Sequence, residues 1–326
     1  MEDTLTANIE GLDVYTSYHV RAYVINEKGT NYGSDISFTT LPNITKFWVV
    51  GSYNGWDNSD NALYIISTES NPEAQGYIDF TDITYGFKLT TDHSWDDAHT
   101  FGDDGTNSGK LANPGDNISL PSVGYYLVKA NASDMTYSTT KTTWGVIGSF
   151  TASGWGSQID MTYNSTLQVF SLALTLESGN EYKFRGTSDW SINYGCSAAD
   201  GSTLDAGGNN IVVDVTGDYA LTLDLSHPNA YTYSANRWGV IGGFNNWGSS
   251  QAMTWDAANG VFTTTITTTA DNSEFKFRAN DGWDVNFGGS LNALTQGGDN
   301  LVIATAGTYT ITLDPWNKVA TVTPAK

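Results

Sequence analysis

Two stretches near the C-terminus, WGVIGGFNNW (Trp238–Trp247) and FKFRANDGW (Phe275–Trp283), decide how the chain is read. In the second stretch, aromatic residues alternate with Lys276 and Arg278. Side chains two residues apart in a β-strand point to the same face. A strand at this position would therefore place its two phenylalanines in a core and both cations together on the opposite face.

The same pair of stretches occurs three times. Earlier copies of the first are FWVVGSYNGW (Phe47–Trp56) and WGVIGSFTASGW (Trp144–Trp155), and earlier copies of the second are FKLTTDHSW (Phe87–Trp95) and YKFRGTSDW (Tyr182–Trp190). The last tryptophan of the second stretch recurs after 95 residues and then after 93 (Trp95, Trp190 and Trp283). This period is that of a domain, because solenoid repeats have periods of about 20–50 residues.

Short alternating stretches within each repeat predict β-strands. Tyr219, Leu221 and Leu223 alternate with Ala and Thr, which indicates a strand with one buried face. Gly, Asn and Asp interrupt such runs about every 8–12 residues, as in a sandwich. We therefore expect an all-β chain of tandem antiparallel β-sandwich domains of the immunoglobulin-like or carbohydrate-binding type. The predicted domains, called the first, second and third repeats below, are residues 45–138, 143–234 and 237–324.

Residues 1–41 resemble the closing strands of a fibronectin type III domain. Leu12 and Tyr18 stand at the positions of that family's tyrosine corner, and strand-like runs follow them. A complete domain of this kind has about 100 residues, so the resemblance implies only its C-terminal part. We expect further chain to precede it and do not expect these few strands to fold alone.

The composition excludes several classes of partner. Fourteen Lys and Arg residues stand against 35 Asp and Glu, for a net charge of −21. Proteins that bind nucleic acids or anionic lipids use positively charged surfaces, so this charge disfavours both classes of partner. The N-terminal residues lack the apolar core of a signal peptide, so the protein is either cytosolic or exported by a signal upstream of this chain. The single cysteine, Cys196, fits a small buried apolar side chain better than a catalytic thiol.

Basic residues concentrate on the repeated strand. Five of the 14 fall at two aligned positions: Lys88, Lys183, Arg185, Lys276 and Arg278. A solubilising role would scatter them, so we interpret them as hydrogen-bond donors that face a ligand. The alternative is that cations protect an edge strand.

Two tryptophans per repeat lie among polar residues and are candidates for exposed aromatic surface. They are Trp56 and Trp95, Trp155 and Trp190, and Trp247 and Trp283. The alternative is that they form lids over the sandwich ends. Trp144 and Trp238, which begin apolar strands, are expected in the core.

Indole faces beside fixed donors and acceptors suit a sugar. The C–H groups of a pyranose stack on the indole, which offers a large rigid surface at low entropic cost. Lys and Arg donate hydrogen bonds to hydroxyls, and Asn accepts them. Asn193 and Asn286, three residues beyond the second tryptophan, fit the acceptor role.

The partial fibronectin-like segment, the tandem β-units and the KFR and W-x-x-N-aromatic-Gly motifs together resemble the SusE/SusF family. These proteins are starch-binding outer-membrane lipoproteins of Bacteroidetes polysaccharide-utilisation systems. The resemblance implies surface display through an N-terminal lipid anchor, partnership with a glycan-import complex, and starch or maltooligosaccharide as ligand. The residues it implies for binding are Trp155, Lys183, Arg185 and Trp190, and Trp247, Lys276, Arg278 and Trp283.

The first repeat departs from this pattern. It has Trp56, Lys88 and Trp95, but Thr90 replaces the arginine, and an acidic insertion follows at residues 96–100. His93 and His99 lie near several aspartates, which we interpret as a solvated loop rather than a metal site.

Two other functions compete with sugar binding. A glycoside hydrolase needs two carboxylates about 5–10 Å apart, and no Asp or Glu pair recurs in the repeats. We therefore expect a non-catalytic protein without a cofactor. The other alternative is a structural or adhesive rod.

Overall fold

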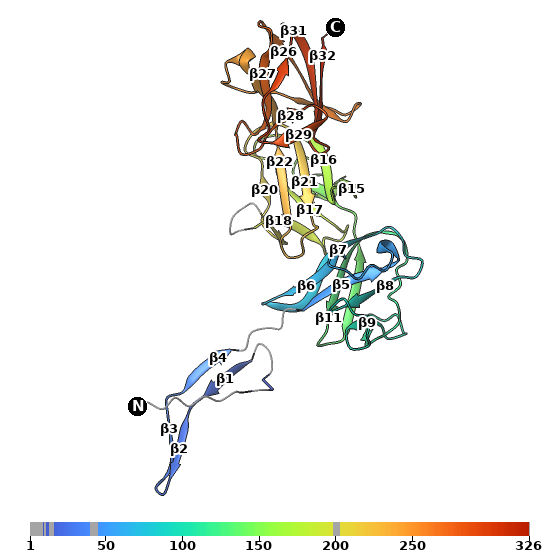
Figure 1. Ribbon diagram of the computed structural model, residues 1–326, viewed down its shortest axis with the longest axis vertical. Coiled ribbons are helices and arrows are strands. Elements are labelled where there is room, and N and C mark those ends of the chain that lie inside the picture. The colour runs from blue at the N-terminus through green and yellow to red at the C-terminus, as the bar shows by residue number, and fades with distance from the viewer. Residues whose placement is uncertain (1–8, 10, 13–15, 40–44, 198–202, 326) are drawn as a thin grey trace. The chain divides into compact units, whose positions relative to one another are not determined.

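The computed structural model describes residues 9, 11–12, 16–39, 45–197 and 203–325. These residues form β-strands and three 3-10 turns, with no α-helix among them. They divide into two compact units, Met1–Lys141 and Thr142–Lys326 (Figure 1). The predicted all-β architecture of tandem antiparallel sandwiches is confirmed. In the described part of the chain, no helix has the length and apolar character needed to cross a membrane.

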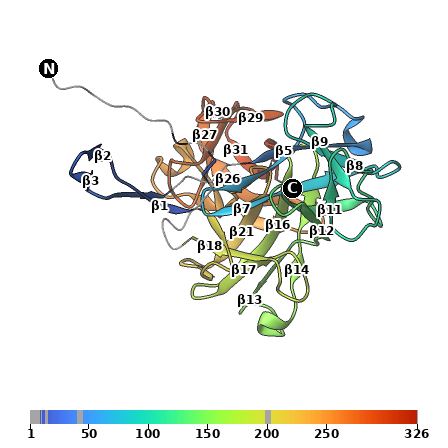
Figure 2. The same ribbon diagram turned by 90° about the horizontal axis from the view of Figure 1, so that it is seen from below.

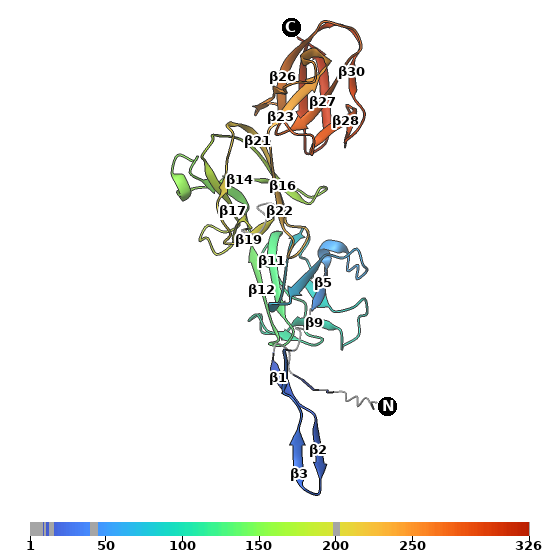
Figure 3. The ribbon, with the colours of Figure 1, turned by 90° about the vertical axis from the view of Figure 1, so that its left-hand side faces the viewer.

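The third repeat consists of two sheets that enclose a core. Its strands are β23 (Trp238–Gly242), β24 (Gln251–Ala252), β25 (Thr254–Asp256), β26 (Val261–Thr268), β27 (Ser273–Ala279), β28 (Asn286–Ser290), β29 (Ala293–Gln296), β30 (Leu301–Ile303), β31 (Gly307–Asp314) and β32 (Val319–Pro324). One sheet has the order β24-β23-β27-β28-β29, with β30 also pairing β27, and the other has β25-β26-β31-β32. Figure 3 shows β23, β27 and β28 side by side.

The second repeat has the same topology. Its strands are β13 (Gly145–Gly148), β14 (Ile159–Asp160), β15 (Thr162–Asn164), β16 (Val169–Leu176), β17 (Glu181–Arg185), β18 (Asn193–Cys196), β19 (Leu204–Ala206), β20 (Ile211–Val212), β21 (Gly217–Asp224) and β22 (Thr232–Asn236). In both repeats one stretch of chain serves both sheets. Met161 separates β14 from β15, Met253 separates β24 from β25, and both methionines are buried.

In the first repeat the corresponding stretch is one continuous strand, β6. The strands are β5 (Lys46–Gly51), β6 (Tyr64–Thr68), β7 (Asn71–Phe80), β8 (Phe87–Thr90), β9 (Thr100–Asp103), β10 (Leu111–Ala112), β11 (Gly124–Asn131) and β12 (Thr136–Lys141). Because β6 pairs with both β5 and β7, all eight strands join in the order β10-β9-β8-β5-β6-β7-β11-β12. Figure 2 labels β5, β7, β8, β9, β11 and β12 of this repeat.

The N-terminal segment forms two separate strand pairs. β1 (Ser17–Val20) pairs with β4 (Ile36–Thr39), and β2 (Tyr23–Asn26) pairs with β3 (Gly29–Tyr32). None of the side chains described between residues 16 and 38 is buried, so this stretch has no core of its own. The predicted boundary between residues 1–41 and the first repeat, which begins at residue 45, lies outside the described residues.

The core contains the residues that alternation predicted. Phe275 and Phe277 are buried, and so are the two tryptophans that begin β23 and precede β13. Trp238 stacks on Phe287 with ring centroids 4.7 Å apart, and Trp144 stacks on Tyr194 at 5.6 Å. The expectation for Cys196 is wrong in degree, because the residue is only half-buried, with its Sγ 3.5 Å from the Asn210 carbonyl oxygen.

A glycine ends the first strand of every repeat because the neighbouring backbone leaves no room for a side chain. A Cβ atom on Gly242 would lie closer than 3.0 Å to the Glu274 carbonyl oxygen, and one on Gly148 equally close to the Glu181 carbonyl oxygen. This spacing lets the first strand lie tightly against the strand that carries the aligned Lys.

We predict that Gly242→Ala destabilises the third repeat, since overpacking of this kind costs about 1–3 kcal/mol. Differential scanning calorimetry should show its melting temperature lowered by several degrees. The matched control is Gly243→Ala, because the nearest atom to that Cβ is 3.8 Å away. Equal melting temperatures for the two variants would contradict this account.

Candidate functional site

Each repeat brings its two polar-loop tryptophans into contact. The ring centroids are separated by 6.1 Å in Trp56–Trp95, 6.1 Å in Trp155–Trp190 and 6.4 Å in Trp247–Trp283. The planes of the two rings are inclined by 55°, 42° and 31° respectively. The sequence predicted the members of each pair as candidates but did not predict their contact.

These pairs present indole surface to solvent. Trp95 and Trp283 are 47% exposed and Trp247 is 36% exposed, whereas the other three are half-buried. Within the described residues, none of the six indole N–H groups donates a hydrogen bond. Trp316 differs, because its Nε1 donates to Thr222 Oγ1 at 3.2 Å. The indole N–H groups of the pairs are therefore free to bind a ligand.

Backbone turns hold the first tryptophan of the first and third repeats in an unusual conformation. Trp247 has φ 56°, and Trp56 has φ 62°. The turn is fixed by an asparagine: Asn245 Oδ1 accepts a hydrogen bond from the Gly242 N–H at 3.0 Å, as Asn54 does from Gly51. Such conformations cost about 1–3 kcal/mol for a bulky residue and cluster at functional sites.

The arginine of the repeated strand lies under the second tryptophan. Arg278 and Arg185 are 6% and 7% exposed. The guanidinium carbon is 5.1 Å from the Trp283 ring centroid in one case and 5.2 Å from that of Trp190 in the other. The aromatic residues and the cations of the strand do lie on opposite faces. Arg278 and Arg185, expected as donors that face a ligand, are instead buried against the second tryptophan.

The arginine connects the two loops, because it packs against the second tryptophan and donates hydrogen bonds to the loop that carries the first. Arg278 Nε donates to Ser250 Oγ at 2.7 Å, and its Nη2 donates to the Gly248 carbonyl oxygen at 3.3 Å. Arg185 Nε donates to Gln158 Oε1 at 2.8 Å. Sequence reasoning missed Ser250 and Gln158, which share no residue type or motif. The arginine therefore positions the aromatic pair.

The lysine of the strand and the predicted asparagine bind each other. Lys276 Nζ donates to Asn286 Oδ1 at 3.1 Å, and Asn286 Nδ2 donates to the Trp283 carbonyl oxygen at 2.7 Å. The second repeat has the same chain through Lys183, Asn193 and Trp190. An ammonium group has three donors, so Lys276 keeps two that no described residue accepts. The oxygen of Asn286, predicted as a ligand acceptor, is engaged by Lys276.

The first repeat links its two loops without an arginine. Thr90 is buried, and its Oγ1 donates to Asn58 Oδ1 at 2.7 Å. Asn58 Nδ2 in turn donates to the Ser94 carbonyl oxygen at 3.2 Å, next to Trp95. Lys88 Nζ donates to the Gly115 carbonyl oxygen at 2.5 Å. The first repeat therefore keeps the pair Trp56–Trp95, with hydrogen bonds of Thr90 and Asn58 in place of those of an arginine.

Side chains of the acidic loop in the first repeat form hydrogen bonds with one another. His99 Nδ1 lies 2.7 Å from Asp96 Oδ1, and this hydrogen bond raises the pKa of His99. Among the described residues, no group of three or more His, Cys, Asp or Glu side chains could hold a metal ion.

Comparisons with known proteins give limited matches. A family model described as a domain of unknown function (DUF8037) matches residues 45–141. Among solved structures, the chain is similar to the crystal structure of SusF from Bacteroides thetaiotaomicron, with a TM-score of 0.31 and 15% identity, over 95% of this chain and 82% of that one. A search of curated proteins finds no match.

The loop that carries Trp190 should respond to acid. Asp189 accepts hydrogen bonds from the Ser191 hydroxyl at 2.7 Å and its N–H at 3.1 Å, which lower the pKa of Asp189 from 3.8 to about 2. A lowered pKa in the folded state means that the carboxylate stabilises the loop at higher pH, and that this contribution is lost as pH falls through about 2. NMR of the Ser191 amide should show a titration near pH 2. Asp189→Asn should remove it, and a midpoint near 3.8 would contradict the geometry.

Proposed function

We propose that this chain binds a glycan without catalysis, through the tryptophan pairs of its repeats, and that the ligand is starch or a maltooligosaccharide. The observation that supports this proposal is the recurrence of one constellation. Two contacting indoles and a lysine from the adjacent strand occur in each repeat, although the residues that support them differ.

The chemistry of the pairs suits a neutral, hydroxyl-rich ligand. Exposed indole surface can stack on the C–H face of a sugar ring, and the free indole N–H groups and the Lys276 ammonium can donate to hydroxyls. The inclination of the rings, between 31° and 55°, fits a curved chain better than a flat one. The exposure of Trp95, Trp247 and Trp283 favours binding over a purely structural role.

The wider setting is proposed from the sequence motifs. We propose that residues 45–138, 143–234 and 237–324 are separate binding domains behind a fibronectin-like segment. We also propose that the chain is displayed at the outer membrane through a lipid anchor, beside a glycan-import complex. Repetition of weak sites would serve such a role, because linked sites raise the apparent affinity for a polymer.

We predict that Trp283→Ala and Trp190→Ala each remove one measurable site in calorimetric titration with maltoheptaose, because each loses half of an aromatic pair. Trp95→Ala should change total binding little, since Thr90 replaces the arginine in that repeat and acidic residues follow Trp95. All three variants should remain folded. The control is Trp238→Ala, because the loss of this buried ring should lower the free energy of unfolding by about 3–5 kcal/mol. A Trp283→Ala protein that binds like the wild type would refute the site.

The two cations should have separable roles. Lys276→Ala should weaken maltoheptaose binding to the third repeat about tenfold, because a charged hydrogen bond contributes about 1.5–3 kcal/mol. Its melting temperature should not change. Arg278→Ala should lower the melting temperature and increase quenching of Trp283 by acrylamide. If Lys276→Ala left binding intact, the lysine would have only a structural role.

A further inference from the structure

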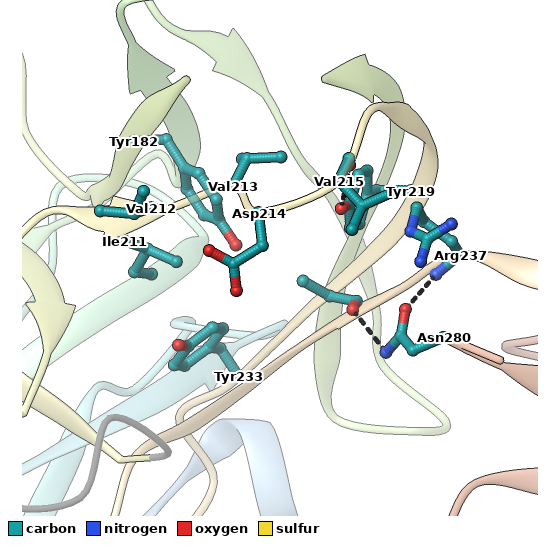
Figure 4. A pocket seen from close by; sticks show the side chains of 11 residues that line it. Tyr182, Ile211, Val212, Val213, Asp214, Val215, Tyr219, Tyr233, Arg237 and Asn280 are labelled. Carbon is teal, nitrogen blue, oxygen red and sulfur yellow. Dashed lines mark hydrogen bonds between the residues drawn. The ribbon is translucent and has the colours of Figure 1, made fainter. Parts of the chain in front are cut away.

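A second kind of cavity opens between the two sheets of the second repeat. Its volume is about 380 Å³, and it is lined by residues of β17, β20, β21 and β22, by residues 213–215, by Arg237 after β22 and by Asn280 of the third repeat (Figure 4). None of the tryptophans or lysines described above lines it. Ligand sites in proteins typically have volumes of about 300–1,000 Å³. A cavity of about 150 Å³ already holds benzene, so this one admits a six-membered ring with its substituents.

The floor of the cavity carries an unpartnered hydroxyl. Tyr182 is 1% exposed, and no described residue forms a hydrogen bond with its hydroxyl. In Figure 4 this hydroxyl points into the cavity, where the Asp214 carboxylate also lies. Burial raises the pKa of Tyr182, so the hydroxyl stays protonated and can both donate and accept. Native proteins rarely leave such a group unsatisfied.

The third repeat shows that the sandwich does not need these polar groups. The position of Tyr182, which pairs with Ile211, is occupied by Phe275, which pairs with Leu301. Counting along the same strands places Ala304 at the position of Asp214. The register of β32 places Ala320 at the position of Tyr233 and Pro324 at that of Arg237. The polar lining is therefore specific to the second repeat.

The rim of the cavity carries one group of each charge, Asp214 and Arg237, so it does not select for an ion of either sign. Asp214 would repel an anion, as would the net charge of −21. Arg237 would repel a cation, although Asp281 lies 3.9 Å from its Nη2. Asn280 fixes the mouth, since its Oδ1 accepts from the Arg237 N–H at 2.9 Å and its Nδ2 donates to the Ala235 carbonyl oxygen at 3.2 Å (Figure 4).

We propose that this cavity binds a single neutral sugar unit, such as the end of a glycan chain. Tyrosine rings and aliphatic side chains would contact the C–H faces of the sugar, and its hydroxyls would satisfy Tyr182, Asp214 and Arg237. A purely apolar ligand would leave the Tyr182 hydroxyl unsatisfied. The proposal rests on the proposed function for its ligand class, but the cavity uses none of the tryptophan pairs. The cavity would therefore bind the end of a glycan chain, whereas the tryptophan pairs would bind sugar units within the chain.

The test is an NMR titration of the full chain, with ¹³C-labelled tyrosine, against glucose, galactose, mannose and N-acetylglucosamine. We expect at least one of these sugars to shift the Tyr182 ring signals. Tyr182→Phe and Asp214→Ala should each weaken that sugar about tenfold or more. Both variants install the residue that the third repeat carries, so both should fold. Tyr182→Phe should keep or raise the melting temperature, which a structural role for the hydroxyl would not allow.

A second pair of variants separates this proposal from the proposed function. Trp155→Ala and Trp190→Ala should lower maltoheptaose binding and leave the monosaccharide shifts unchanged. If no monosaccharide binds, or if Tyr182→Phe and Asp214→Ala bind it like the wild type, the cavity proposal is wrong even where the tryptophan variants lose maltoheptaose. If the tryptophan variants keep maltoheptaose binding while the cavity variants lose the monosaccharide, the cavity proposal stands and the proposed function fails.

Discussion

A buried guanidinium holds the candidate site of the third repeat together. A charge removed from water must be paired or hydrogen-bonded, and Arg278 meets this requirement through Ser250, the Gly248 carbonyl and the face of Trp283. Those partners belong to two different loops, so satisfying the charge also fixes the two indoles against each other. In this repeat the partners of the buried arginine therefore hold the aromatic pair in place. Lys276, two residues earlier, is half-buried and keeps donors that no described residue accepts.

The three repeats solve the same problem with different side chains. Arginine reaches Ser250 in the third repeat and Gln158 in the second, while the first uses a buried Thr90 and Asn58 to connect its loops. The Trp–Trp distance nevertheless varies only from 6.1 to 6.4 Å. Support that changes around a constant pair of indoles is the arrangement expected when the indoles contact the ligand. The linked pairs of the second and third repeats would bind a polymer more tightly than either pair alone.

The sequence predicted those features of the fold and the candidate site that depend on local patterns of residues. Alternation placed Phe275 and Phe277 inside, and the apolar run after Trp238 placed that ring in the core, because both signals are local. The contact between Trp247 and Trp283 is not local. β23 and β27 are antiparallel, so the loops that follow them start at opposite ends of the pair. Ser250 reaches Arg278 only because the first loop turns back toward β24. The sequence has no periodic pattern that would predict this turn.

Indole resonances give the most direct test of the central claim that the paired tryptophans contact a glucan. In a ¹⁵N-labelled chain titrated with maltoheptaose, the indole signals of Trp155, Trp190, Trp247 and Trp283 should shift together with increasing ligand. Those of Trp144 and Trp238, which lie in the core, should not move. Shifts absent from all four paired signals, or shared equally by the core tryptophans, would contradict the account.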